Sequence, residues 1–108
     1  MDSNWIPFNY REFYDVPRIF VLEVVNRFVL FDSKFDEILD DYNENYQIWL
    51  VENPYEIDWS ASWSDLPRSN DILIGKIAVK DVIFDETLRK FIDIQTFYKA
   101  GLENLFHQ

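Results

Sequence analysis

The stretch from Arg18 to Asp32, RIFVLEVVNRFVLFD, constrains the fold more than any other part of the chain. Two apolar runs flank the pair Asn26-Arg27, and Asn tolerates the positive φ that a two-residue hairpin turn requires. This spacing predicts a β-hairpin over about residues 18–32. Side chains alternate between the two faces of a strand, so one face of the hairpin is wholly apolar and is assigned to the core. Its members are Phe20, Leu22, Val24, Val29 and Phe31.

The other face of the hairpin is mixed, because it includes Glu23 and Asp32 among apolar residues. A hairpin alone is only marginally stable in water, so further segments must complete the sheet and cover it. The alternating run at 46–51 predicts a third strand, and the run at 72–79 predicts a fourth. Gly75 in that fourth strand indicates a bulge or a close approach of another segment. We expect the aromatic-rich residues 1–17 to pack across the mixed face, or to form one short helical turn around residues 10–14.

A helix is predicted after the hairpin, over about residues 34–43. Ser33 is a suitable N-cap, and Asp36 and Glu37 fall in the first turn, where the helix dipole favours acids. The spacing of the apolar residues is i, i+3, i+4, i+7, which is typical of an amphipathic helix. These residues are Phe35, Ile38, Leu39 and Tyr42.

The C-terminal third predicts a second helix over about 96–106, although Gly101 in its middle lowers helix propensity. Residues 85–95 fit either a helix or a hairpin loop followed by a strand over 89–94, and the pattern slightly favours the strand. The expected fold class is therefore α+β: a mainly antiparallel sheet of four or five strands, built on the hairpin, with two helices. The length of 108 residues is that of a single domain spanning 1–108.

Composition limits the cellular context and the available chemistry. The chain has no cysteine, so disulfides and thiol catalysis are excluded. No apolar run approaches the length of about 20 residues that a membrane span needs. The N-terminus lacks the basic-then-apolar pattern of a secretory signal. We therefore expect a cytoplasmic protein without a membrane partner.

The net charge of −10 is concentrated in one segment, since residues 32–58 contain nine acids and one base. Direct binding to nucleic acid is not expected, because contacts to the phosphate backbone need a basic surface. The acidic strip from Asp36 to Asp58 is either a solvated face that keeps the protein soluble or a surface that steers a basic partner toward the protein.

One short pattern resembles the calcium-binding loop of the EF-hand family. Asp41, Asn43, Asn45 and Glu52 fall at the first, third, fifth and twelfth positions of that loop. The chain departs from the family pattern at Tyr46, which replaces the glycine of the sharp turn. The resemblance implies a calcium site at these four residues.

Residues 52–71 are irregular and contain Tyr55, Trp59 and Trp63. Loops of this length in a small domain are often functional, and tryptophan is enriched at binding hot spots. The two tryptophans either anchor the loop over the core or line a small-ligand site, in which carboxylates would supply any acid–base chemistry. A single histidine, His107, lies next to the C-terminus and gives no support to histidine-based catalysis. No catalytic residue and no cofactor is assigned.

The sequence favours a non-catalytic acidic interaction module that binds a basic protein surface. Small inhibitors and immunity proteins share this physical principle, and the likeness is one of charge and size only. The alternatives are a small-ligand-binding protein or carboxylate-based enzyme that uses the 52–71 loop, and self-association through the aromatic N-terminal segment. The candidate binding residues are Asp36, Glu37, Asp40, Asp41, Glu44, Tyr55, Trp59 and Trp63.

Overall fold

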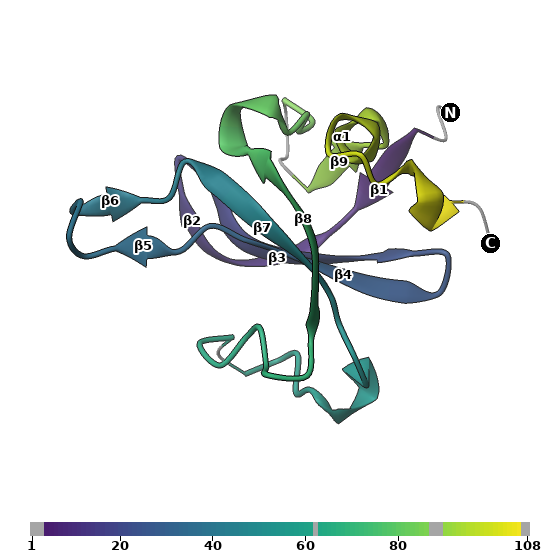
Figure 1. Ribbon diagram of the computed structural model, residues 1–108, viewed down its shortest axis with the longest axis horizontal. Helices are drawn as coiled ribbons and strands as arrows, with labels where there is room; N and C mark the ends of the chain where they lie inside the picture. Colours follow the sequence, from purple (N-terminus) through teal and green to yellow (C-terminus); the bar gives the residue numbers. More distant parts are fainter. Residues whose placement is uncertain (1–3, 62, 87–89, 107–108) are drawn as a thin grey trace.

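A five-stranded antiparallel sheet forms the centre of the protein, in the strand order β2-β3-β4-β7-β8 (Figure 1). The computed structural model describes residues 4–61, 63–86 and 90–106. The sheet strands are β2 (Asn9–Tyr14), β3 (Val16–Val24), β4 (Arg27–Asp32), β7 (Asn45–Leu50) and β8 (Ile72–Ala78).

The predicted hairpin is confirmed as β3 and β4, but its turn lies one residue earlier than expected. Val25 and Asn26 form the turn, with φ of 49° and 65°, and Leu22 pairs with Val29. Both φ values are positive, as a two-residue hairpin turn of the I′ type requires. Each β4 residue therefore pairs with the β3 residue two positions before the one that the expected turn would give. Because side chains alternate between the two faces of a strand, a shift of two positions leaves every side chain on its expected face. The five residues assigned to the core are all buried together in one cluster.

Both faces of the sheet are covered (Figure 1). One face packs against β1 (Trp5–Pro7), β9 (Phe91–Asp93), α1 (Gln95–Lys99) and a 3-10 helix over Glu103–Phe106. The other face packs against the 52–71 loop through buried Trp63 and Leu66. The mixed face of the hairpin is therefore covered by this loop. The expectations of cover by residues 1–17 and of a helical turn around 10–14 are both wrong for the described residues 4–17. These residues form β1, which pairs with β9, and β2, which pairs with β3.

The predicted helix over 34–43 is wrong. These residues form a two-stranded hairpin of β5 (Phe35–Asp36) and β6 (Asp41–Tyr42). A short helix is stable only where its apolar stripe is buried, and both faces of the sheet are already occupied. Acids of like charge also fall four residues apart in this segment, which disfavours a helix further. The fold is mainly antiparallel β, and helices are a minor part of it.

The C-terminal helix is much shorter than predicted. α1 ends at Lys99, Gly101 follows with φ of 74°, and a separate 3-10 helix begins at Glu103. Within 85–95, Phe91–Asp93 forms strand β9, so the favoured strand interpretation is confirmed there; residues 87–89 of the expected loop and strand lie outside the described residues.

The role predicted for Gly75 is confirmed on both counts. The register between β7 and β8 shifts between Ile48 and Trp49, whose partners are Gly75 and Leu73. A Cβ atom at Gly75 would lie 3.4 Å from a methyl carbon of Leu102. The C-terminal segment therefore packs closely on β8.

Two further 3-10 turns cover Pro54–Glu56 and Val79–Asp81. None of the helices in the described part of the chain is long and apolar enough to cross a membrane.

Candidate functional site: an acidic arm

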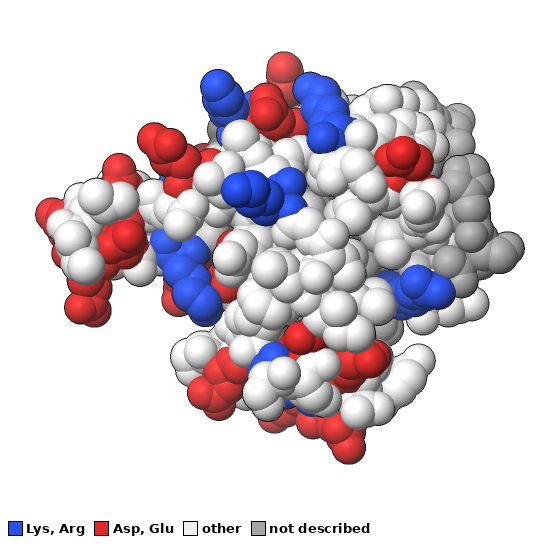
Figure 2. All heavy atoms as spheres, viewed as in Figure 1, with Lys and Arg blue, Asp and Glu red and all other residues white. Residues whose placement is uncertain are grey.

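The hairpin of β5 and β6 connects β4 to β7 and projects beyond the ends of these strands, and we call residues 35–42 the acidic arm (Figure 1). It contains four acids and no basic residue. Figure 2 shows Asp and Glu atoms gathered over the arm and, separately, over the 52–71 loop. The structure thus brings four of the predicted binding acids together on one projecting element, and exposed Glu44 follows it directly. The four are Asp36, Glu37, Asp40 and Asp41.

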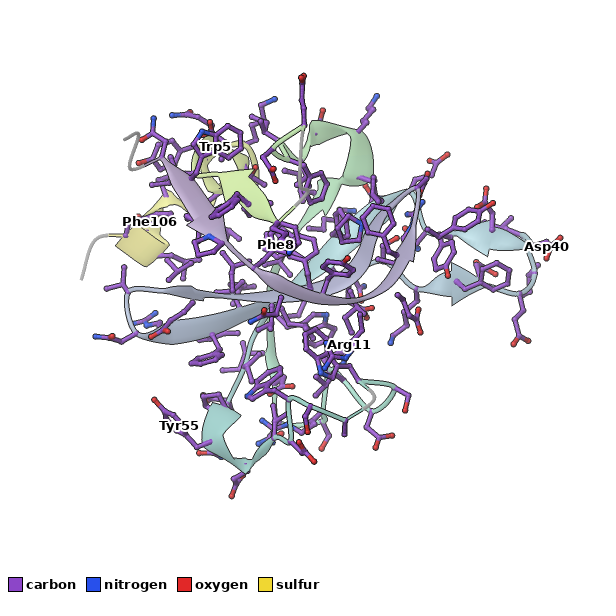
Figure 3. All side chains as sticks on the ribbon, turned by 180° about the vertical axis from the view of Figure 1, so that it is seen from behind. Trp5, Phe8, Arg11, Asp40, Tyr55 and Phe106 are labelled. Carbon is purple, nitrogen blue, oxygen red and sulfur yellow. The ribbon has the colours of Figure 1, made fainter. Side chains whose placement is uncertain are left out.

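The tip of the arm carries two aliphatic side chains that the sequence analysis assigned to the buried side of a helix. Ile38 is 95% exposed and Leu39 is 70% exposed. The Asp36 carboxylate accepts hydrogen bonds from the backbone N–H groups of both, at 2.9 Å and 3.3 Å. Asp40 completes the turn with φ of 55°, and its side chain points outward from the arm (Figure 3). The tip is an ordered turn that presents apolar surface to water.

The base of the arm is fixed to the body of the protein by Tyr42. Its ring lies 5.5 Å from the Tyr14 ring in a stacked arrangement and 5.3 Å from Phe35 in an edge-on one. The guanidinium of Arg18 lies 4.6 Å above the same ring, a favourable cation–π geometry. Tyr14 belongs to β2 and Arg18 to β3, so the arm is held by the sheet.

Arg18 is itself buried and fully engaged. Its guanidinium donates to the Asp15 carboxylate at 2.7 Å and to Ser33 Oγ at 3.1 Å. The Ser33 hydroxyl in turn donates to the backbone carbonyl of Asn43 at 2.8 Å. This chain of contacts joins the β2–β3 turn to both ends of the arm, and it restricts the directions in which the arm can point.

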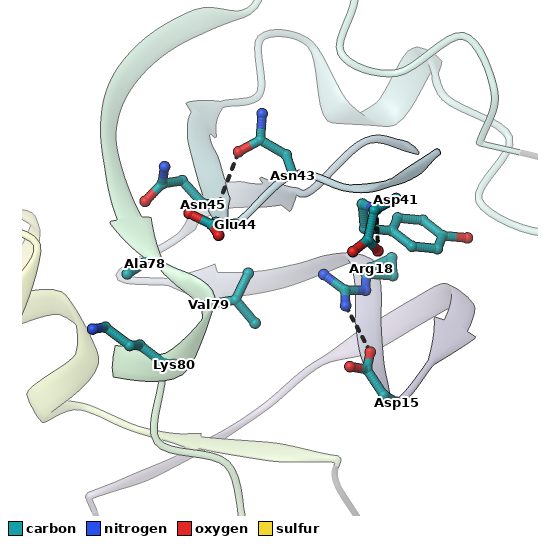
Figure 4. A pocket seen from close by; sticks show the side chains of 10 residues that line it. Asp15, Arg18, Asp41, Asn43, Glu44, Asn45, Ala78, Val79 and Lys80 are labelled. Atoms are coloured by element: carbon teal, nitrogen blue, oxygen red, sulfur yellow. Dashed lines mark hydrogen bonds and ion pairs between the residues drawn. The ribbon is translucent and has the colours of Figure 1, made fainter. Parts of the chain in front are cut away.

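A hollow of about 470 Å³ opens beside the base of the arm (Figure 4). Three of the four residues of the predicted calcium loop, Asp41, Asn43 and Asn45, line it together with Arg18 and Lys80. Glu52 does not line it, because strand β7, roughly 17 Å long at 3.4 Å per residue, runs between Asn45 and Glu52.

The helix–loop–helix shape of an EF-hand is therefore absent from these residues. The entering segment is a hairpin, and the last half of the loop is a strand. Among the described residues, no group of three or more His, Cys, Asp or Glu is placed to hold a metal ion.

The 52–71 loop is tied down by its tryptophans, as the anchor interpretation predicts. Trp63 is buried, its Nε1 donates to the Trp59 carbonyl, and the Arg11 guanidinium lies 4.6 Å above its ring. The Trp59 ring stacks on Phe28 at 5.8 Å. Tyr55, by contrast, is 92% exposed and points away from the molecule (Figure 3).

The acidic strip of the sequence is consequently two separate surfaces. The arm and the 52–71 loop leave the sheet at different places (Figures 1 and 3), and Tyr55 lies far from Asp40 at the tip of the arm (Figure 3). Trp63 of the loop and Phe35 of the arm line one hollow of about 470 Å³. A hollow of about 290 Å³ remains between the loop and the sheet, with Trp59 and Trp63 in its wall.

Asp32 is a buried carboxylate that sequence reasoning did not single out. Its side chain is 4% exposed, and Lys34 Nζ lies 3.1 Å from its Oδ2. The same Lys34 ammonium donates to the Leu66 carbonyl at 3.3 Å, which links the end of β4 to the 52–71 loop. Burial raises the pKa of the Asp32 carboxyl above its ordinary value of 3.8, and Lys34 offsets part of this rise.

The raised pKa of Asp32 predicts a specific pH dependence of stability. The folded state binds this proton more tightly than the unfolded chain, so the associated stability is present below pH 3.8 and is lost as pH rises through the folded-state pKa. Asp32→Asn removes this dependence. The unfolding free energy of the wild type, minus that of Asp32→Asn, should be larger at about pH 4 than at about pH 7.

Urea denaturation at a series of pH values measures this difference. The unfolding free energy of Lys34→Met should depend more steeply on pH than that of the wild type, because the ammonium group that lowers the Asp32 pKa is removed. Parallel pH profiles for the wild type and Asp32→Asn would show that Asp32 has an ordinary pKa in the folded protein.

No protein-family model, no curated protein and no solved structure matches the chain. What the protein does is therefore inferred from the shape, charge and exposure of its own surfaces.

Proposed function

We propose that this protein is a non-catalytic interaction module that binds a basic protein surface through its acidic arm. The observation that carries the proposal is the arm itself, a projecting hairpin with four acids and no basic residue. Within the part of the chain that the structure describes, none of these four carboxylates forms an ion pair. Their mutual repulsion opposes folding of the arm, and a basic partner would relieve it.

The position of the arm suits electrostatic steering. Charges on a projecting element meet an approaching partner before the rest of the surface does. The potential of the arm extends over about 8 Å at physiological ionic strength, which is the Debye length. The net charge of −10 has the same sign as the arm, so the whole molecule attracts the same partners and repels nucleic-acid phosphates.

Neutralising the arm should weaken partner binding and reduce its dependence on salt. The arm variant carries Glu37→Gln, Asp40→Asn and Asp41→Asn. Its association with a basic partner at low salt is expected to be about tenfold slower, a loss that disappears at high salt. Capture of partners from a lysate of the source organism at low salt, elution with a salt gradient and mass spectrometry identify the partners. Association rates are then measured on the purified partner.

A control variant removes the same number of acids elsewhere on the surface. Asp65→Asn, Glu86→Gln and Glu103→Gln are all at exposed positions outside the arm. Both variants have the same net charge, so any difference between them is due to the position of the acids. The proposal fails if the two variants bind the captured basic proteins equally well at low salt.

A further inference from the structure

The exposed tip of the arm sets a second requirement for the partner. Ile38 and Leu39 stand at the end of a projecting hairpin with 95% and 70% of their surface in water. A hairpin turn is usually made of polar residues and glycine, which have no solvation cost there. Aliphatic side chains in this position lower the solubility of the free protein, so their presence is accounted for if a partner buries them.

We propose that Ile38 and Leu39 are a paired apolar anchor that enters an apolar cleft bordered by Lys and Arg side chains on the partner. This inference rests on the proposed function, since it describes the partner of the same arm. The acids define the border of the cleft, because Asp36, Glu37, Asp40 and Asp41 flank the tip on both sides in the sequence. An apolar centre surrounded by a polar rim is the usual organisation of a protein–protein interface.

The tip is ordered before binding, which favours affinity. The Asp36 carboxylate holds the backbone N–H groups of both anchor residues, and Tyr42 fixes the base of the arm against Tyr14 and Arg18. A preorganised turn loses little conformational freedom when it enters a cleft. Burying the two side chains should then contribute at least tenfold in affinity, by the free energy of transferring aliphatic surface out of water.

The charge of the arm favours a basic protein over the other partners that could bury the apolar tip. A second copy of this chain also carries a net charge of −10 and would be repelled. A membrane with anionic lipids repels acidic side chains at its surface. A cleft bordered by cationic side chains is the surface that satisfies both the acids and the apolar residues.

Two synthetic helical peptides of equal length and equal positive charge test the inference. The first carries lysine on one face and leucine on the other, and the second has glutamine in place of leucine. Calorimetric titration at low salt is expected to show that the wild type binds the Lys/Leu peptide at least tenfold more tightly than the Lys/Gln peptide. The Ile38→Ser, Leu39→Ser variant should lose this preference and keep its affinity for the Lys/Gln peptide.

A matched control replaces another exposed aliphatic pair. Ile72→Ser, Leu73→Ser alters two residues of β8 that are 47% and 52% exposed, and it should retain the preference for the Lys/Leu peptide. Equal affinity of the wild type for the two peptides, or loss of the preference in the β8 variant, overturns the inference about the tip. Failure of the wild type to bind either peptide counts against the proposed function itself.

Two further measurements on the wild type and the tip variant test whether a second copy of the chain or a lipid surface buries the tip. Light scattering over a range of concentrations is expected to show the same mass for both proteins. Sedimentation with vesicles of zwitterionic lipid is expected to leave both proteins in the supernatant. Self-association or vesicle binding that the tip substitutions abolish would assign the tip to a second copy or to a lipid surface, and would overturn the inference.

Discussion

Replacement of Phe31 by alanine is expected to lower the free energy of unfolding by about 3–5 kcal/mol. Phe31 is fully buried near the C-terminal end of β4. Its ring stacks on Phe20 with centroids 4.7 Å apart and meets the ring edges of Tyr46 and Phe97 at 5.8 Å and 5.7 Å. These neighbours come from β3, β7 and α1, so they cannot collapse together into the space that the ring leaves. Small domains are stable by about 5–15 kcal/mol, which makes this loss a large fraction of the total.

Urea denaturation followed by tryptophan fluorescence measures the change. The slope of the unfolding free energy against urea should stay the same, because the variant buries nearly the same surface on folding. Phe13→Ala is the matched control, since the Phe13 side chain on β2 is 47% exposed and its removal should cost less than about 1 kcal/mol. Equal losses in the two variants would contradict the central position of Phe31.

The hairpin and its core face could be predicted because the alternation of side chains is a local property of the sequence. Every residue assigned to that face, from Phe20 to Phe31, is apolar. The opposite face contains Glu23 and Asp32, so only one of the two faces is wholly apolar. The exact turn could not be predicted with the same precision. Asn26-Arg27 lacks the glycine that fixes a two-residue turn, and the strands instead place Val25 at positive φ.

The arm was misassigned because the same apolar spacing fits two structures. Phe35, Ile38, Leu39 and Tyr42 would form one side of a helix, but a helix needs a surface on which that side is buried. Segments far along the chain occupy that surface, since 52–71 covers one face of the sheet and 91–106 the other. Sequence spacing within 34–43 contains no information about those distant segments.

The candidate site could be predicted only in part, for a related reason. Composition alone indicates that the acids from Asp36 to Asp41 are exposed and close together. The exposure of Ile38 and Leu39 follows from the hairpin and not from their chemical type, so sequence reasoning assigned them to the interior. The burial of Arg18 depends on its contacts with Tyr42 and Ser33, and that of Asp32 on Lys34, which binds the Leu66 carbonyl of the 52–71 loop. A partner within the fold is what allows such charged groups to be buried.

Trp63→Ala should also reduce the free energy of unfolding by about 3–5 kcal/mol, and it tests what the 52–71 loop does. Trp63 is 4% exposed and packs with Ile19, Val21 and Leu30 on the face of the sheet opposite Phe31. The substitution removes its hydrogen bond to the Trp59 carbonyl and its contact with the Arg11 guanidinium. We therefore expect the loop to separate from the sheet before the rest of the protein unfolds.

Tyr55→Ala in the same loop is the control, because this side chain is 92% exposed and its loss should change stability by less than about 0.5 kcal/mol. Increased binding of a hydrophobic dye by Trp63→Ala, before the main unfolding transition, would report the uncovered face of the sheet. The arm follows the end of β4 and is held by the contacts of Tyr42 with Tyr14 and Arg18, which the substitution leaves in place. Binding of the Lys/Leu peptide should consequently survive the substitution. A loss of stability below about 1 kcal/mol would instead mean that the Trp63 ring does not anchor the loop, and the hollow beside Trp59 would become the place to search for a small ligand.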